Sequence, residues 1–62
     1  MEVIEIMRAL EGNENTQIIE YPNGAKLFSG TSQNIPADLQ NRHIVTIRLL
    51  PQIYLGVALY IA

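Results

Sequence analysis

Apolar and polar residues alternate along this chain with two different periods, and each period predicts one type of element. Near the start, apolar residues recur at the spacing of one helix face: Val3, Ile6, Met7 and Leu10. Glu2 and Glu5 lie at the N-terminal end of this segment, where the helix dipole favours negative charge. Gly12 suits the left-handed residue that often follows a helix. We therefore predict an α-helix from about residue 2 to 11, which must pack on other elements because it is too short to be stable alone.

The next segments have the composition of β-strands. Residues 16–21 are rich in β-branched and aromatic side chains, and residues 25–29 are expected to be the returning strand. Between them, Pro22, Asn23 and Gly24 predict a tight turn, with Pro22 at the first central position of a type I turn and Gly24 in the left-handed conformation. The two strands are therefore expected to form an antiparallel hairpin.

The middle of the chain predicts a loop followed by a short helical segment. Residues 30–34 are small or polar, which is typical of a loop. Pro36 suits the first position of a helix, so we expect one or two helical turns between residues 36 and 41. Ile35 and Leu39 are the apolar residues that would anchor these turns to the core.

Two further strands are predicted in the C-terminal third. Residues 44–50 follow the two-residue period of a strand. One face of this strand would carry Val45, Ile47 and Leu49, and the other would carry Arg42, Ile44, Thr46 and Arg48. Residues 57–61 are apolar on both faces, so this strand is either central and covered or part of an interface.

Together these elements predict one small α+β domain that spans residues 1–62. An N-terminal helix would pack on a four-stranded, mostly antiparallel sheet, with a helical turn between the second and third strands. A chain this short buries only about 60% of the surface that its unfolded form exposes, yet most positions from 44 to 62 are apolar. We therefore expect a homo-oligomer, first of all a dimer. The predicted interface residues are Ile53, Tyr54, Leu55, Leu59, Tyr60 and Ile61.

Composition and charge exclude several other classes of protein. The sequence has no cysteine and one histidine, so neither a disulfide nor a metal site is expected. Arg48 and Pro51 interrupt the apolar C-terminal third, which argues against a membrane span. The net charge is −2, divided as 1 − 5 = −4 over residues 1–24 and 3 − 1 = +2 over residues 25–62. Nucleic acid and anionic lipid are therefore not the expected partners.

No catalytic motif is recognisable, so we expect neither an enzyme nor a cofactor. His43 is the one histidine and Asp38 the one aspartate, and no nucleophile motif surrounds Ser29, Thr31 or Ser32. His43 directly precedes a predicted strand, and we interpret it as a partly buried, hydrogen-bonded residue.

Arg42, Thr46 and Arg48 form the strongest candidate for a binding site. On a regular strand they share a face, where two guanidinium groups and a hydroxyl group could hold the phosphate or carboxylate of an anionic ligand such as a nucleotide. A two-fold dimer would double this set. The alternative is that the two arginines only keep an exposed strand edge soluble.

Three segments carry a resemblance to a known group of proteins. They are IIEYPNGAKLFSG (residues 18–30), IPADL (35–39) and IVTI (44–47). They resemble small uncharacterised proteins encoded by phages and prophages of Gram-positive bacteria, and the resemblance covers about residues 2–48. The last strand here is less charged than in that pattern. IPADL also resembles swapped-hairpin DNA-binding regulators, but the basic strand residues that such regulators use to contact phosphates are largely missing.

The resemblance implies a non-enzymatic accessory protein that acts by stoichiometric binding in the host cytoplasm. We expect an inhibitor of a bacterial defence system, which would either block a defence protein or sequester an anionic nucleotide signal. Two alternatives stay open: a structural module that assembles into homo-oligomers, and a small nucleic-acid-binding regulator. The sequence starts without the basic segment of a signal peptide, which also favours the cytoplasm.

Overall fold

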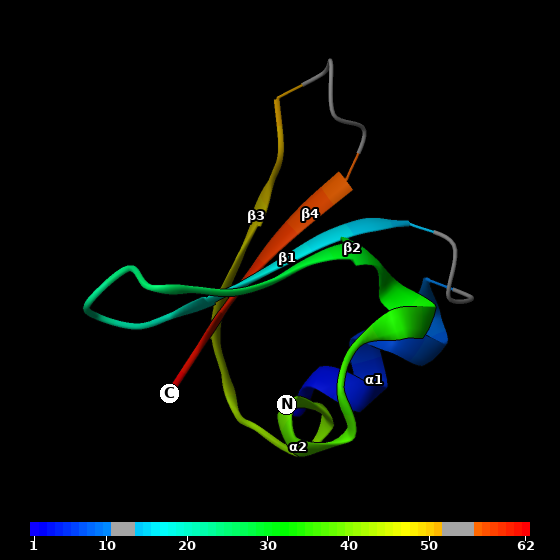
Figure 1. Ribbon diagram of the computed structural model, residues 1–62, viewed down its shortest axis with the longest axis horizontal. Coiled ribbons are helices and arrows are strands. Elements are labelled where there is room, and N and C mark those ends of the chain that lie inside the picture. The colour runs from blue at the N-terminus through cyan, green and yellow to red at the C-terminus, as the bar shows by residue number, and fades with distance from the viewer. Residues whose placement is uncertain (11–13, 52–55) are drawn as a thin grey trace.

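The computed structural model describes residues 1–10, 14–51 and 56–62, and it contains the elements of an α+β fold (Figure 1). In chain order they are α1 (Val3–Ala9), β1 (Asn15–Glu20), β2 (Lys26–Thr31), the 3₁₀ turn η1 (Ser32–Asn34), α2 (Ala37–Gln40), β3 (Ile44–Leu49) and β4 (Gly56–Ile61). The order of helices and strands agrees with the prediction, including a short helix between the second and third strands.

The four strands form one mixed sheet with the order β2-β1-β4-β3. The outer pairs, β1 with β2 and β3 with β4, are antiparallel, whereas the central pair, β1 with β4, is parallel. The predicted α+β class is therefore confirmed, but the parallel pair at the centre of the sheet was not predicted. It arises because the chain passes through η1, α2 and β3 before β4 returns beside β1.

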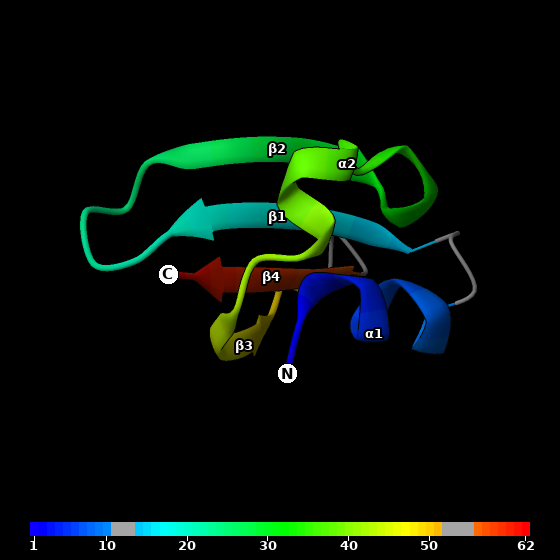
Figure 2. The same ribbon diagram turned by 90° about the horizontal axis from the view of Figure 1, so that it is seen from below.

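Both helices lie on the same side of the sheet (Figure 2). The core fills the space between the helices and this face, and its buried members are Val3, Ile18, Ile35, Leu39, Leu59 and Ile61. Ile18 and Leu59 are paired directly across the parallel strands, and neither is exposed. Ile35 and Leu39 anchor the short helical segment, as predicted. The apolar face of α1 is also confirmed, because Val3 is buried and Ile6 and Met7 pack against the core.

Helix α1 begins with a capping box. The Glu5 carboxylate accepts a hydrogen bond from the Glu2 backbone N–H at 3.2 Å, and the Glu2 side chain caps the Glu5 N–H in return. Arg8 lies in the last turn, where a cation complements the helix dipole. Gly12, predicted to follow the helix, lies outside the described residues.

The β1–β2 hairpin is present, but its turn differs from the predicted type I turn. The Gly24 N–H donates to the Glu20 carbonyl oxygen at 2.8 Å, and the Asn23 Oδ1 accepts from the Ala25 N–H at 3.0 Å. The Tyr21–Pro22 peptide bond is cis. Gly24 has a φ of 79°, so the predicted left-handed residue is confirmed.

Strand β3 contains an irregularity that changes which side chains share a face. Ile44 pairs with Ile61, but Thr46 pairs with Tyr60, so an extra residue is accommodated between them. Ile44 therefore lies on the helix side of the sheet with Ile47, and not beside Thr46 as regular alternation had predicted. An extra residue of this kind is a local backbone feature that the two-residue period cannot reveal.

The parallel pair depends on a close approach of two backbones at Gly56. A Cβ added to Gly56 would overlap the backbone carbonyl of Asn15, its partner in β1. We expect Gly56→Ala to lower the free energy of unfolding by about 1–3 kcal/mol, because the strands must separate to admit the methyl group. Urea denaturation followed by circular dichroism measures this change.

Gly30→Ala is the matched control for this prediction. A Cβ at Gly30 would approach only the end of the Phe28 ring, at 3.2 Å, and a side chain can shift where a backbone cannot. We expect a change of less than about 1 kcal/mol for this variant. Equal losses in the two variants would contradict the role given to Gly56.

Candidate functional site

The face of the sheet opposite the helices is called the open face here. Strand register assigns its positions in rows that run across all four strands. One row contains Ser29, Gln17, Ala58 and Arg48, and the next contains Lys26, Ile19, Tyr60 and Thr46. No helix or strand among the described residues packs over these rows (Figure 2). The open face is therefore a surface that spans the four strands and on which a partner could lie.

The centre of the open face is apolar. Ala58 is only 4% exposed, and the side chains of Ile19 and Tyr60 beside it are half-buried. Leu27, on edge strand β2, is 39% exposed. A small apolar centre bordered by polar residues is the usual anatomy of a protein contact surface.

The open face is also basic, although the whole chain is acidic. Lys26 and Arg48 lie on it near opposite edges. Glu20 is the one acidic residue in the four strands, and it pairs with Ile61, which places it on the helix side. The helices carry further carboxylates, including Glu5 and Asp38. The protein therefore has a positive sheet face and a negative helix side.

Arg48 and Tyr60 form the most specific contact on the open face. The Arg48 guanidinium carbon lies 5.7 Å from the centroid of the Tyr60 ring, within the range of a cation–π interaction. Thr46 pairs directly with Tyr60 across β3 and β4. Two of the three predicted ligand-binding residues, Thr46 and Arg48, are thus on one face, and both lie next to Tyr60.

Arg42, the third predicted residue, has a different environment. Its Nε donates to the Ala62 carbonyl oxygen at 2.8 Å, and its guanidinium lies 3.6 Å from the Glu20 carboxylate. Arg48 is opposite Ala58, and Arg42 bonds to Ala62, so the points at which the two arginines meet this strand are about 13 Å apart. The structure does not bring Arg42 and Arg48 into one cluster, because the Arg42 side chain bonds to Ala62, next to the C-terminal end of β4.

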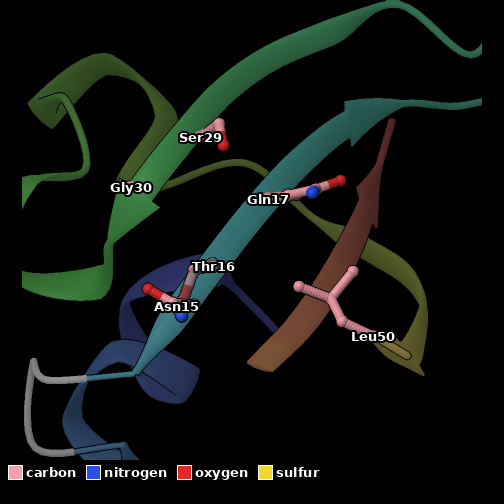
Figure 3. A pocket seen from close by; sticks show the side chains of 6 residues that line it. All are labelled: Asn15, Thr16, Gln17, Ser29, Gly30 and Leu50. Carbon is pink, nitrogen blue, oxygen red and sulfur yellow. The ribbon is translucent and has the colours of Figure 1, made fainter. Parts of the chain in front are cut away.

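A shallow pocket of about 240 Å³ opens at one end of the open face (Figure 3). It is lined by Asn15, Thr16, Gln17, Ser29, Gly30 and Leu50. The lining contains no charged side chain, and the volume is below the range of about 300–1,000 Å³ typical of small-molecule sites. Sequence reasoning did not identify this pocket. The signal in the sequence was that Asn15 and Gln17 alternate with Thr16 and Ile18, which indicates a strand with one polar, uncovered face.

The predicted interface residues divide into three groups. Leu59 and Ile61 have no exposed surface, because they fill the core of the protomer itself, so the expectation that they lie at an interface is corrected. Tyr60 points to the opposite side of the same strand and lies on the open face. The remaining three, Ile53, Tyr54 and Leu55, lie outside the described residues.

His43 is exposed rather than partly buried, which corrects the sequence interpretation. Its backbone carbonyl accepts a hydrogen bond from the Ala62 N–H at 3.0 Å, so its backbone has the structural role and its ring lies at the surface. Within residues 1–10, 14–51 and 56–62, no three His, Asp or Glu side chains are grouped as metal ligands would be. None of the described helices is long and apolar enough to cross a membrane.

No known protein family matches the chain, and neither a curated protein nor a solved structure shows significant similarity to it.

The two arginines are expected to differ in their effect on stability. Arg42→Gln removes the hydrogen bond to Ala62 and the partly exposed ion pair with Glu20, so we expect a loss of about 1 kcal/mol in the free energy of unfolding. Arg48→Gln removes only an exposed cation–π contact, for which we expect about 0.5 kcal/mol or less. Urea denaturation of both variants makes the comparison. A larger loss for Arg48→Gln would contradict these roles.

Proposed function

We propose that this protein acts by stoichiometric binding, without catalysis, and that the open face is its contact surface. The observation that carries the proposal is an uncovered sheet face with an apolar centre at Ala58 and Tyr60 and a positive charge near each edge, from Lys26 and Arg48. A small apolar centre with a polar and charged border is suited to a protein partner that covers it.

The chemistry of the face favours a protein partner over a small anionic ligand. The pocket at Gln17 and Ser29 is small and uncharged, and Arg42 and Arg48 do not converge on one phosphate position. A sheet face that spans four strands instead matches the breadth of protein contacts. Among the two modes expected for a defence inhibitor, blocking a protein therefore has more support than sequestering a nucleotide.

Charge complementarity indicates an acidic surface on that partner. The open face holds Lys26 and Arg48 and no carboxylate in its strand positions, so an acidic patch would be attracted to it and a basic one repelled. The resemblance to phage-encoded accessory proteins supports a bacterial defence protein as the target. In this proposal, the chain covers an acidic functional surface of a defence protein and blocks it.

The test uses phage plating on bacteria that carry cloned defence systems, one system per strain. Expression of the chain should restore plating on at least one strain. Calorimetry with the purified defence protein of that strain should then give one chain bound per target site. Arg48→Glu is expected to weaken this binding by about tenfold or more and to abolish the restored plating, because it reverses the charge at the contact surface.

Arg8→Glu is the matched control, because it makes the same change of charge on the exposed surface of α1, on the opposite side of the molecule. This variant should restore plating as well as the unmodified chain does. Equal effects of the two variants would show that net charge, and not the open face, governs the activity. If each molecule of this protein converted many molecules of a substrate to product, the protein would be an enzyme, and stoichiometric binding would be contradicted.

A further inference from the structure

Strand β3 is at the edge of the sheet, and among the described residues only its first part is paired on the outer side. At its start, the Ile44 N–H already donates to the Met1 carbonyl oxygen at 2.8 Å, and Glu2 pairs with His43. At its end, Pro51 has no backbone N–H to donate. The part of the edge that remains available is therefore residues 45–49.

The backbone groups that face this edge can be assigned from the register. The Leu50 N–H donates to the Gly56 carbonyl oxygen at 2.8 Å, so Leu50 faces β4. In an antiparallel ladder every second residue faces the same neighbour, which directs Arg48 and Thr46 toward β4 as well. The backbone N–H and C=O groups of Ile47 and Leu49 consequently face the free edge.

The side chains along this edge are apolar and poorly covered. Val45, Ile47 and Leu49 are 47%, 42% and 84% exposed. Ile47 and Leu49 lie on the helix side of the sheet, and their exposure shows that the helices do not cover them. The C-terminal part of β3 extends away from α1 and α2 (Figure 1). Soluble proteins usually protect such an edge with lysine, proline or a covering segment, because an open edge pairs readily with another strand.

We infer that the β3 edge is a homodimer interface, in which two copies pair antiparallel about a two-fold axis through Ile47. Ile47 of one copy then faces Ile47 of the other, and Leu49 faces Val45 of the second copy. The two four-stranded sheets become one continuous sheet with all helices on one side. This inference is independent of the proposed function.

Charge and length both select this register. In an antiparallel pair, residues whose backbone groups face the free edge must lie opposite residues of the same kind in the second copy. The possible registers therefore differ from one another by two residues. Placing the axis at Arg48 would set two guanidinium groups directly opposite each other, which is unfavourable, and would pair only residues 47–49. The axis at Ile47 brings residues 45–49 of the two copies side by side and sets Arg48 opposite Thr46 of the second copy.

The same register explains how the open face could be enlarged. Arg48 of one copy and Arg48 of the other occupy diagonal positions on the open face, with Cα atoms about 7–8 Å apart. The basic surface would then be continuous across the dimer.

Sedimentation equilibrium from about 1 µM to about 1 mM chain tests the association, since this range covers weak and transient complexes. The mass should rise from 7.0 kDa toward twice that value. Ile47→Lys should keep the monomer mass with an unchanged circular dichroism spectrum, because an edge lysine opposes strand pairing. An unmodified chain that stays monomeric over the whole range would overturn the inference, as would dimerisation undiminished in folded Ile47→Lys.

Single-cysteine variants test the register, since the chain has no cysteine of its own. Ile47→Cys places its two thiols opposite each other, within the span of a disulfide, so mild oxidation should give a covalent dimer. In Leu49→Cys the two thiols are too far apart to join, although Leu49 is the more exposed position. If the disulfides formed only through random collisions between monomers, the more exposed cysteine at position 49 would therefore crosslink more than the one at position 47. Crosslinking at 49 equal to or greater than that at 47 would overturn the register.

Discussion

The parallel pairing of β1 with β4 is the interaction on which the rest of the structure depends. It joins two antiparallel pairs that are otherwise separate, and it sets Ile18 beside Leu59 at the centre of the core. The pairing requires a glycine at position 56, because the backbones of the two strands approach too closely there for a side chain. Once these strands are in register, the helix side of the sheet presents one apolar surface on which α1 and α2 can pack.

Because both helices lie on one side of the sheet, the other face is not covered by them. Among the described residues no helix or strand covers the opposite face, which carries a mixture of apolar, polar and basic side chains. The uneven charge along the sequence is converted by folding into two surfaces of opposite sign. Arg42 does not belong to the positive surface, because it holds the C-terminal end of β4 through Ala62 and Glu20.

Periodicity predicted the elements of this fold well and their arrangement less well. The apolar spacing of α1, the strands of the hairpin, the left-handed Gly24 and the anchors Ile35 and Leu39 all follow from local preferences, which act within a few residues. The irregular residue in β3 and the exposure of His43 depend on which strand lies beside which. Regular alternation therefore placed Ile44 on the wrong face, and it grouped Arg42 with Arg48 although β4 holds them apart.

By itself, the sequence determined the class of fold, the positions of helices and strands, and the absence of disulfide chemistry, because these depend on composition and on short-range spacing. It also led to the prediction that part of the apolar C-terminal third meets a partner. Only the tertiary structure decided how that apolar surface is used. Leu59 and Ile61 fill the core, whereas Ile47 and Leu49 stay exposed, because β4 is inserted between β1 and β3 and leaves β3 at the edge. Strand order is set by contacts between distant segments, which no local pattern encodes.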